Sequence, residues 1–163
     1  MIRSLIEIYR QEGWLPDCRM SLCKGFTQGG SNADVVLTDT YVKFGKLAAD
    51  YGVDWKTAYE ALVKDAEDEP PNWSVEGRGG LHSWKSLNYV PTDDYDPYGV
   101  GPFTRSISRT VEYAYDDYCV AEMARGLGNQ ADYEKYIQTS DYWKNMWKAD
   151  QDVSYADELV FRS

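Results

Sequence analysis

The sequence has few of the residues that build zinc sites. It contains one histidine, His82, and three cysteines at positions 18, 23 and 119, with no C-x-x-C pair. A structural zinc site needs four cysteine or histidine ligands at short spacings, so we expect none here. A disulfide between Cys18 and Cys23 is compatible with the sequence, but the odd cysteine count gives it little support.

Basic residues and long apolar runs are scarce as well. Lysine and arginine number 17 against 27 aspartates and glutamates, for a formal net charge of −10. Nucleic acids and anionic membrane surfaces attract basic patches, so we expect neither as a partner. An acidic balance suits a neutral ligand, a cation or a metal, and it equally suits a plain role in solubility. No apolar run approaches the roughly 20 residues that span a bilayer, so no membrane span is predicted.

The start of the chain lacks the pattern of a secretory signal. Met1 leads directly into an amphipathic segment without a basic start, an apolar core or a small-residue cleavage site. We therefore expect either an intracellular protein or a chain that lacks its true N-terminus.

Tyrosine and tryptophan are abundant, with 14 and 6 copies against only 4 phenylalanines. Their side chains combine an apolar face with a polar edge, which suits stacking on sugar rings. A helical core rich in tyrosine and tryptophan explains the same composition. The length of 163 residues fits one domain.

The pattern of apolar residues predicts helices and no convincing strand. The expected helices cover residues 2–11, 31 to about 45, 54–66, roughly 106–126, and 129–147. Ser31 is expected to cap the second helix by accepting from its third amide. Residues 70–105 carry little regular pattern, and a loop of that length is usually functional. We predict an all-α fold of helical hairpins packed side by side, as in a toroid.

The predicted helix around residue 112 is the most informative element. Residues 107, 111, 114, 118 and 121 form an apolar stripe that we expect to be buried. Glu112 and Asp116 are four residues apart and share a face, whereas Asp117 points roughly 100° away. Acidic groups beside a buried stripe need a partner. They predict either a ligand or metal site, or an ion-pair network with Arg105, Arg109 or Arg125.

Several motifs in order resemble those of glycoside hydrolase family 92. They are Gly13-Trp14-Leu15-Pro16, the run from Gly29 to Lys43 (GGSNADVVLTDTYVK), Arg78-Gly79-Gly80-Leu81, Trp84-Lys85, Leu87-Asn88-Tyr89-Val90-Pro91, the run from Ser106 to Asp117 (SISRTVEYAYDD), Gly126-Leu127-Gly128 and Tyr142-Trp143-Lys144-Asn145. Each motif is weak alone, but their order and spacing over residues 13–147 are specific.

The resemblance implies a calcium-dependent, inverting exo-α-mannosidase with a catalytic (α/α)6 toroid. Family members are several times longer than this chain, so residues 1–163 look like an internal fragment of the catalytic domain. Segments that carry the general acid and base of the family are not found in the sequence, so no catalytic residue is predicted and the fragment alone is expected to be inactive. The resemblance also implies mannose-containing glycans or glycoproteins as substrates, with an α-1,2 or a mannose-phosphate-mannose linkage. It implies a secreted or cell-surface location.

The candidate site residues come from three segments of the chain. For sugar binding they are Asn32, Asp34, Glu76, Arg78, Trp84, Asp116 and Asp117, and for calcium Glu112. Asp34 serves equally well as a helix cap, and Glu76 and Arg78 can hold each other instead of a ligand. Trp73, Trp84 and Tyr89 can form a sugar platform or simply pack in the core.

Two other functions remain open from the sequence. One is a non-catalytic helical protein that binds carbohydrate or calcium, and the other is a helical interaction module with incidental carboxylates. Calcium titration by calorimetry separates them, because an interaction module would give no heat of binding.

Overall fold

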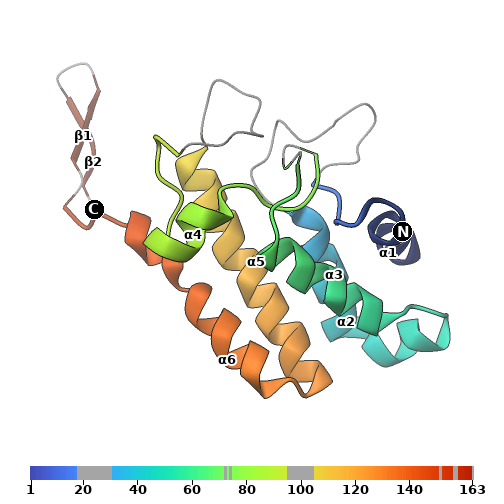
Figure 1. Ribbon diagram of the computed structural model, residues 1–163. Coiled ribbons are helices and arrows are strands. Elements are labelled where there is room, and N and C mark those ends of the chain that lie inside the picture. The colour runs from blue at the N-terminus through green and yellow to red at the C-terminus, as the bar shows by residue number, and fades with distance from the viewer. Residues whose placement is uncertain are drawn as a thin grey trace.

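The computed structural model describes residues 1–17, 31–71, 73, 75–94, 105–150, 152–155 and 158–162. Within them the chain is helical, apart from a short hairpin near its end (Figure 1). The helices are α1 (Ile2–Glu12), α2 (Asn32–Asp50), α3 (Trp55–Glu67), α4 (Leu81–Leu87), α5 (Ser106–Leu127) and α6 (Gln130–Thr139), followed by the 3-10 helix η1 (Tyr142–Met146). The proposed cysteine pair at 18 and 23 and the start of the Gly29–Lys43 motif lie outside the described residues.

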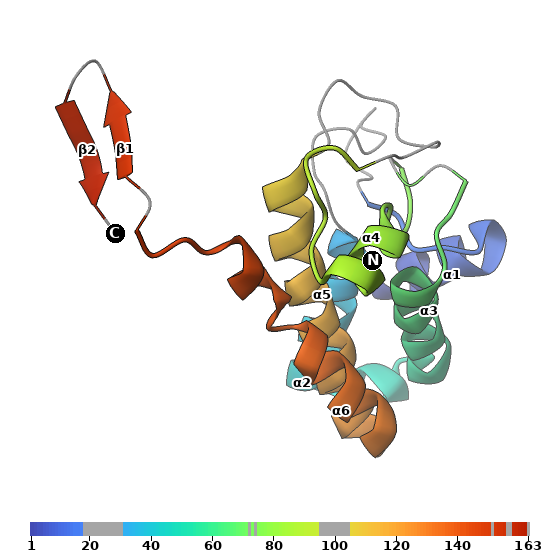
Figure 2. The same cartoon turned by 60° about the vertical axis from the view of Figure 1, so that its left-hand side comes forward.

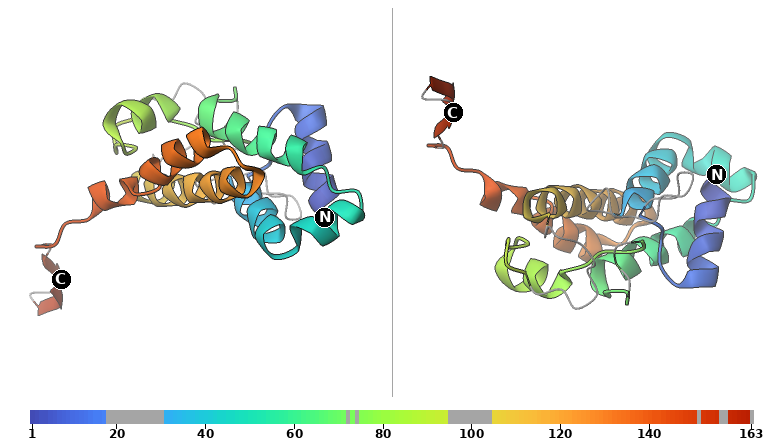
Figure 3. Two further views of the ribbon diagram at one scale, coloured as in Figure 1. Left: turned by 90° about the horizontal axis from the view of Figure 1, so that it is seen from below. Right: turned by 90° about the horizontal axis from the view of Figure 1, so that it is seen from above.

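The longest helix, α5, is the centre of the arrangement. It packs against α2, α3, α6 and η1, and α6 runs back along it (Figures 1 and 3). α1, α2 and α3 contact one another and lie together to the right of α5 in the view of Figure 1. The predicted arrangement of helices side by side is confirmed.

Local capping interactions explain where several helices begin and end. Asp54 accepts a hydrogen bond from the Thr57 amide at 3.1 Å and so starts α3. Asn129 caps α6 in the same way through the amide of Asp132. Gly128 ends α5 in the left-handed conformation with φ 82°, which glycine adopts without strain.

Two apolar clusters form the core. The larger one joins α1, α2, α3, α5 and α6 through Ile6, Leu15, Leu37, Leu62, Val120 and Met123. The smaller one lies beneath α4 and is built from Leu81, Trp84, Val90, Tyr113 and Ala114. The polar site described below lies where residues of both clusters approach α5.

Three predictions about helix bounds are wrong. α2 does not fade near Gly45 but continues to Asp50 beyond a kink at Phe44, where φ is −136°. The helix expected over 129–147 divides after Thr139, because the Thr139 and Ser140 hydroxyls bond the carbonyls of Tyr136 and Ile137. α4 lies inside the segment that we expected to be irregular.

The predicted buried stripe of α5 is also wrong in phase. Ile107, Val111 and Tyr118 are 67%, 46% and 44% exposed, whereas Ala114 and Ala121 are buried. The helix instead turns Thr110, Tyr113 and Asp117 inward. The buried face of its N-terminal half, up to Asp117, is largely polar because it meets charged groups from other segments, and hydrophobicity alone therefore indicated the wrong face.

The sequence analysis missed one two-stranded sheet. β1 (Asp152–Tyr155) pairs antiparallel with β2 (Glu158–Arg162), with a register shift between Val153 and Ser154. The hairpin lies apart from the helices in all views (Figures 1, 2 and 3).

Candidate functional site

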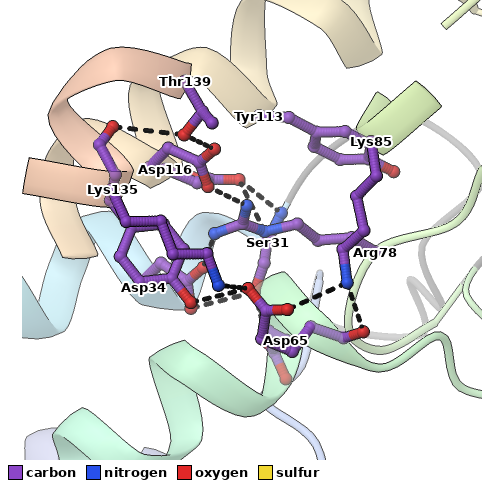
Figure 4. A network of polar contacts seen from close by, with 12 residues as sticks. Ser31, Asp34, Asp65, Arg78, Lys85, Tyr113, Asp116, Lys135 and Thr139 are labelled. Atoms are coloured by element: carbon purple, nitrogen blue, oxygen red, sulfur yellow. Dashed lines mark hydrogen bonds and ion pairs between the residues drawn. The ribbon is translucent and has the colours of Figure 1, made fainter. Parts of the chain in front are cut away.

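A fully buried guanidinium, that of Arg78, is the centre of the site (Figure 4). Its Nη1 donates to Asp117 Oδ1 at 2.6 Å, and its Nη2 donates to Asp34 Oδ2 at 2.9 Å. Its Nε lies 3.7 Å from Asp116 Oδ2. Arg78 therefore connects α2 to α5 from the loop that precedes α4.

The backbone of this loop is held on both sides of Arg78. The Tyr113 hydroxyl accepts from the Gly79 amide and donates to the Gly79 carbonyl, both at 2.9 Å. Gly79 also lies against the indole of Trp73, where an added Cβ would be 2.1 Å from the ring carbon Cγ. Gly77 has φ +56° and packs on Trp14 and Pro70. These contacts hold the backbone on both sides of Arg78 and so restrict where its guanidinium can lie.

A second part of the network surrounds Ser31. Its amide donates to Asp116 Oδ2 at 3.2 Å. Its hydroxyl oxygen lies 2.8 Å from Asp65 Oδ2 and 3.3 Å from Asp34 Oδ1. The other oxygen of Asp65 accepts from the Leu15 amide at 3.2 Å. The hydroxyl expected to cap α2 is therefore engaged by carboxyl groups, and Ser31 makes no side-chain cap bond.

Burial dominates the protonation of these carboxyl groups. It raises the pKa of Asp34 to about 6, although Arg78 opposes the shift. Burial also raises the pKa of Asp65 and of Asp116 well above the usual range. Burial acts to lower the pKa of Arg78, but the charges of Asp117, Asp116 and Asp34 outweigh it and raise this pKa overall. The buried network thus favours the protonated forms of these carboxyl groups and keeps the guanidinium of Arg78 charged.

The network extends to α4 and α6 through Glu67. Lys135 Nζ lies 2.6 Å from Glu67 Oε1, and Lys85 Nζ lies 3.0 Å from Glu67 Oε2. Burial opposes the charge of Glu67, but hydrogen bonds from Lys135 and Lys85 hold its pKa at about 2. Thr139 of α6 donates to Asp117.

A second polar group lies around Asp17, which is 5% exposed, and includes the partly exposed Asn32. The Asp17 amide donates to the Val75 carbonyl at 3.1 Å, and the Asn32 side chain donates to Asp17 Oδ1 at 3.4 Å. Burial raises the Asp17 pKa to about 7; Asn32 and Arg105 lower it and Glu112 raises it. Sequence analysis missed Asp17, although it directly follows the Gly13-Trp14-Leu15-Pro16 motif.

The predicted residues thus fall into three places. Asp34, Arg78, Asp116 and Asp117 converge in the buried network, with no more than 2% of any of them exposed. Asn32 and Glu112 are partly exposed and lie near Asp17. Glu76 lies nearby as well, because its backbone forms an antiparallel β-bridge with Pro16, the residue before Asp17. Trp84 is 3% exposed and packs on the rings of Tyr113 and Tyr142, so it offers no open face in this chain.

Two of the arginines expected to pair with Glu112, Asp116 or Asp117 also have other partners. Arg109 lies 3.5 Å from Asp94 and stacks over Trp73. Arg125 pairs with Glu122. Asp116 and Asp117 use Arg78 instead, a residue that the sequence analysis had placed with Glu76.

Comparison with known proteins identifies the family. Residues 1–158 match the description "Glycosyl hydrolase family 92 catalytic domain". The chain belongs to glycosyl hydrolase family 92. An uncharacterized secreted glycosidase of Arthroderma benhamiae is 62% identical over 94% of this chain. The predicted resemblance is therefore confirmed.

Solved family 92 enzymes have the same arrangement of helices. An inverting mannosidase from Bacteroides thetaiotaomicron matches 91% of this chain with a TM-score of 0.74 and 26% identity. An α-mannosidase from the same bacterium, in complex with mannoimidazole, matches 91% with a TM-score of 0.64 and 26% identity. The predicted helical fold of the family is confirmed.

The chain is much shorter than these relatives. It spans 19% of the fungal glycosidase and 18% and 17% of the two bacterial enzymes.

The described residues do not by themselves fit a calcium ion, the metal implied by the family. No group of three or more histidine, cysteine, aspartate or glutamate side chains among them is arranged to hold a metal. Asp34, Asp116 and Asp117 converge on the Arg78 guanidinium, which takes the central position that a cation would need. Glu112 stands apart from this network. Among the described residues, no helix is long and apolar enough to cross a membrane.

Proposed function

We propose that the chain is an internal part of the catalytic (α/α)6 domain of an exo-α-mannosidase, with residues 1–163 all in that domain. The match of residues 1–158 to the family 92 catalytic domain carries this proposal. The mannosidases among its structural neighbours support the substrate, and the inverting neighbour supports the stereochemistry. The secreted fungal relative supports a secreted or cell-surface location and a glycan or glycoprotein substrate.

We assign the predicted sugar-binding residues to two roles. Asn32, Glu76 and the additional Asp17 are placed to contact sugar hydroxyls, because they are polar and adjoin one another beside the buried network, with Asn32 and Glu76 partly exposed. Asp34, Arg78, Asp116 and Asp117 hold that edge in position from beneath, since Arg78 donates to Asp34 and Asp117, and Asp116 accepts from the Ser31 amide. Trp84 supports the same wall through Tyr113.

The chemistry requires groups beyond this chain. An inverting glycosidase needs an acid and a base whose carboxyl groups stand roughly 6.5–9.5 Å apart, so that a water molecule fits between base and sugar. We propose that both come from other parts of the complete enzyme and that this chain alone is inactive. A bound calcium ion would accept neighbouring sugar hydroxyls as oxygen ligands and so help to orient the sugar. Glu112 remains the proposed contributor to its binding.

The test uses the complete polypeptide that contains this sequence. Incubation with α-linked mannosides, followed at once by proton NMR, is expected to show free mannose that appears first as the β-anomer. Removal of calcium with a chelator is expected to abolish release, and added calcium to restore it. Release of the α-anomer first would contradict inversion, and activity that survives chelation would contradict the calcium requirement.

A non-catalytic carbohydrate- or calcium-binding role is the alternative. Calorimetry with mannose and with calcium tests it on the 163-residue chain. Binding without hydrolysis by the complete polypeptide would support this alternative.

A further inference from the structure

One hydroxyl group stands between two buried carboxyl groups in this structure. Ser31 Oγ lies 2.8 Å from Asp65 Oδ2 and 3.3 Å from Asp34 Oδ1, and all three residues are 0% exposed. A serine hydroxyl has one hydrogen and can donate it to only one of them. The other carboxyl oxygen then faces an oxygen lone pair at a distance too short for a water molecule to lie between them, unless that carboxyl carries a proton.

The distribution of positive charge decides which carboxyl holds the proton. Asp34 Oδ2 accepts directly from Arg78 Nη2 at 2.9 Å, which favours its ionised form. Asp65 has only neutral donors, the Leu15 amide at 3.2 Å and the Ser31 hydroxyl. An ionised Asp65 would be a buried charge beside the charge of Asp34.

We propose that Asp65 is a positioning residue that carries a proton at neutral pH and donates it to Ser31 Oγ, so that Ser31 donates to Asp34. Hydrogen bonds are then donated from Asp65 to Ser31 and from Ser31 to Asp34 Oδ1, while Asp34 Oδ2 accepts from Arg78. These bonds connect α3 to the first turn of α2 and set the position of Asn32, the next residue. The argument rests on the geometry of the network and does not depend on the enzymatic activity proposed above.

The charges around Asp65 favour its neutral form. The titratable groups that act on it or respond to it are Asp34 on α2, Arg78 before α4 and Tyr9 on α1, and Asp116 and Asp117 on α5 act in turn on Arg78. Four carboxyl groups thus share one guanidinium, and Arg78 makes its two hydrogen bonds to Asp34 and Asp117. Burial and the charge of Asp34 both raise the pKa of Asp65.

The decisive experiment compares Asp65→Asn with Asp65→Ala in the complete polypeptide. Asparagine can donate from its amide nitrogen to Ser31 and accept from Leu15, as a protonated aspartate does, whereas alanine can do neither. We expect Asp65→Asn to unfold within about 2 °C of the parent at pH 7, and Asp65→Ala at least about 4 °C lower. Equal destabilisation by the two variants, including failure of both to fold, would overturn the proposal.

Infrared difference spectroscopy reports the proton directly. The spectrum of Asp65→Asn minus that of the parent at pH 7 is expected to lose the carbonyl stretch of a protonated carboxylic acid. Asp68→Asn is the matched control, because Asp68 is an exposed carboxyl at the end of the same helix and pairs with Lys64. It is expected to lose only the bands of an ionised carboxylate. Loss of ionised bands from Asp65→Asn would show that Asp65 is charged and would refute the assignment.

Discussion

Replacement of Arg78 by methionine tests whether the buried network stabilises this fold. Arg78 makes charge-assisted hydrogen bonds of 2.6 Å to Asp117 and 2.9 Å to Asp34, and none of its surface is exposed. At about 1.5–3 kcal/mol for each such bond, their loss amounts to about 3–6 kcal/mol. Removal of one partner from a buried ion pair has a measured cost of about 3–5 kcal/mol, because an uncompensated charge remains. We therefore expect a loss of about 4 kcal/mol at pH 7.

Urea unfolding followed by circular dichroism measures this loss. With a slope of about 2 kcal/mol per molar urea, the midpoint should fall by about 2 M. The loss should be smaller at pH 5, because the carboxyl groups left behind can be neutralised by protons. Arg10→Met is the matched control: its ion pair with Asp54 has a similar distance of 2.8 Å, but the two side chains are 45% and 44% exposed.

The control pair should contribute no more than about 1 kcal/mol, as exposed ion pairs do. Equal midpoints for the two variants would show that burial does not strengthen the Arg78 interactions. A loss below about 1 kcal/mol for Arg78→Met would refute the reasoning outright.

Three further predictions follow from the site. Gly79→Ala should prevent normal packing, because its Cβ would lie 2.1 Å from the Trp73 ring; circular dichroism and proteolysis should show a largely unfolded product, and a native-like unfolding midpoint would contradict this. The pKa values of Asp34 and Asp17 are raised to about 6 and about 7, so the folded state binds more protons than the unfolded state. The stability that comes from this extra proton binding is complete below about pH 3.9 and is lost as the pH rises through 6 and 7. Urea midpoints for Asp17→Asn that still fall by the same amount between pH 5 and 8 would exclude Asp17 as a source of that loss. In the complete polypeptide, Asn32→Ala should weaken mannose binding roughly tenfold, the effect of about 1.4 kcal/mol, with an unchanged unfolding midpoint; calorimetry that finds unaltered affinity would remove Asn32 from the sugar site.

The helices were predictable where the signals that form them are local. Asp54 and Asn129 cap the helices that follow them, and Gly128 ends α5, all within a few residues of the groups they satisfy. The division after Thr139 could not be predicted, because hydroxyl bonds to the backbone compete with a helical pattern that continues in the sequence. α4 was missed because it has only 7 residues, too few for a periodic pattern.

The site was only partly predictable because its contacts join distant segments. The carboxyl groups of Asp116 and Asp117 were recognised from the cost of burying them, but their partner Arg78 gave no local sign of that role. Asp65 looks like an ordinary polar residue near the end of α3, yet it is fully buried. Asp65 is buried because the start of α2 packs against it at Ser31, and the sequence of α3 alone gives no sign of this contact.

The long sequence separation of the Arg78 contacts has a kinetic consequence. The hydrogen bonds of Arg78 join residues 44 and 39 positions apart, and the bond from the Ser31 amide to Asp116 spans 85 positions. Closing such long loops loses chain entropy before any contact forms, so these bonds should be made late, after the helices have docked. Loss of Arg78 should then leave the refolding rate nearly unchanged and accelerate unfolding. The ion-pair network would act chiefly as a barrier to opening, and it would set the lifetime of the native state.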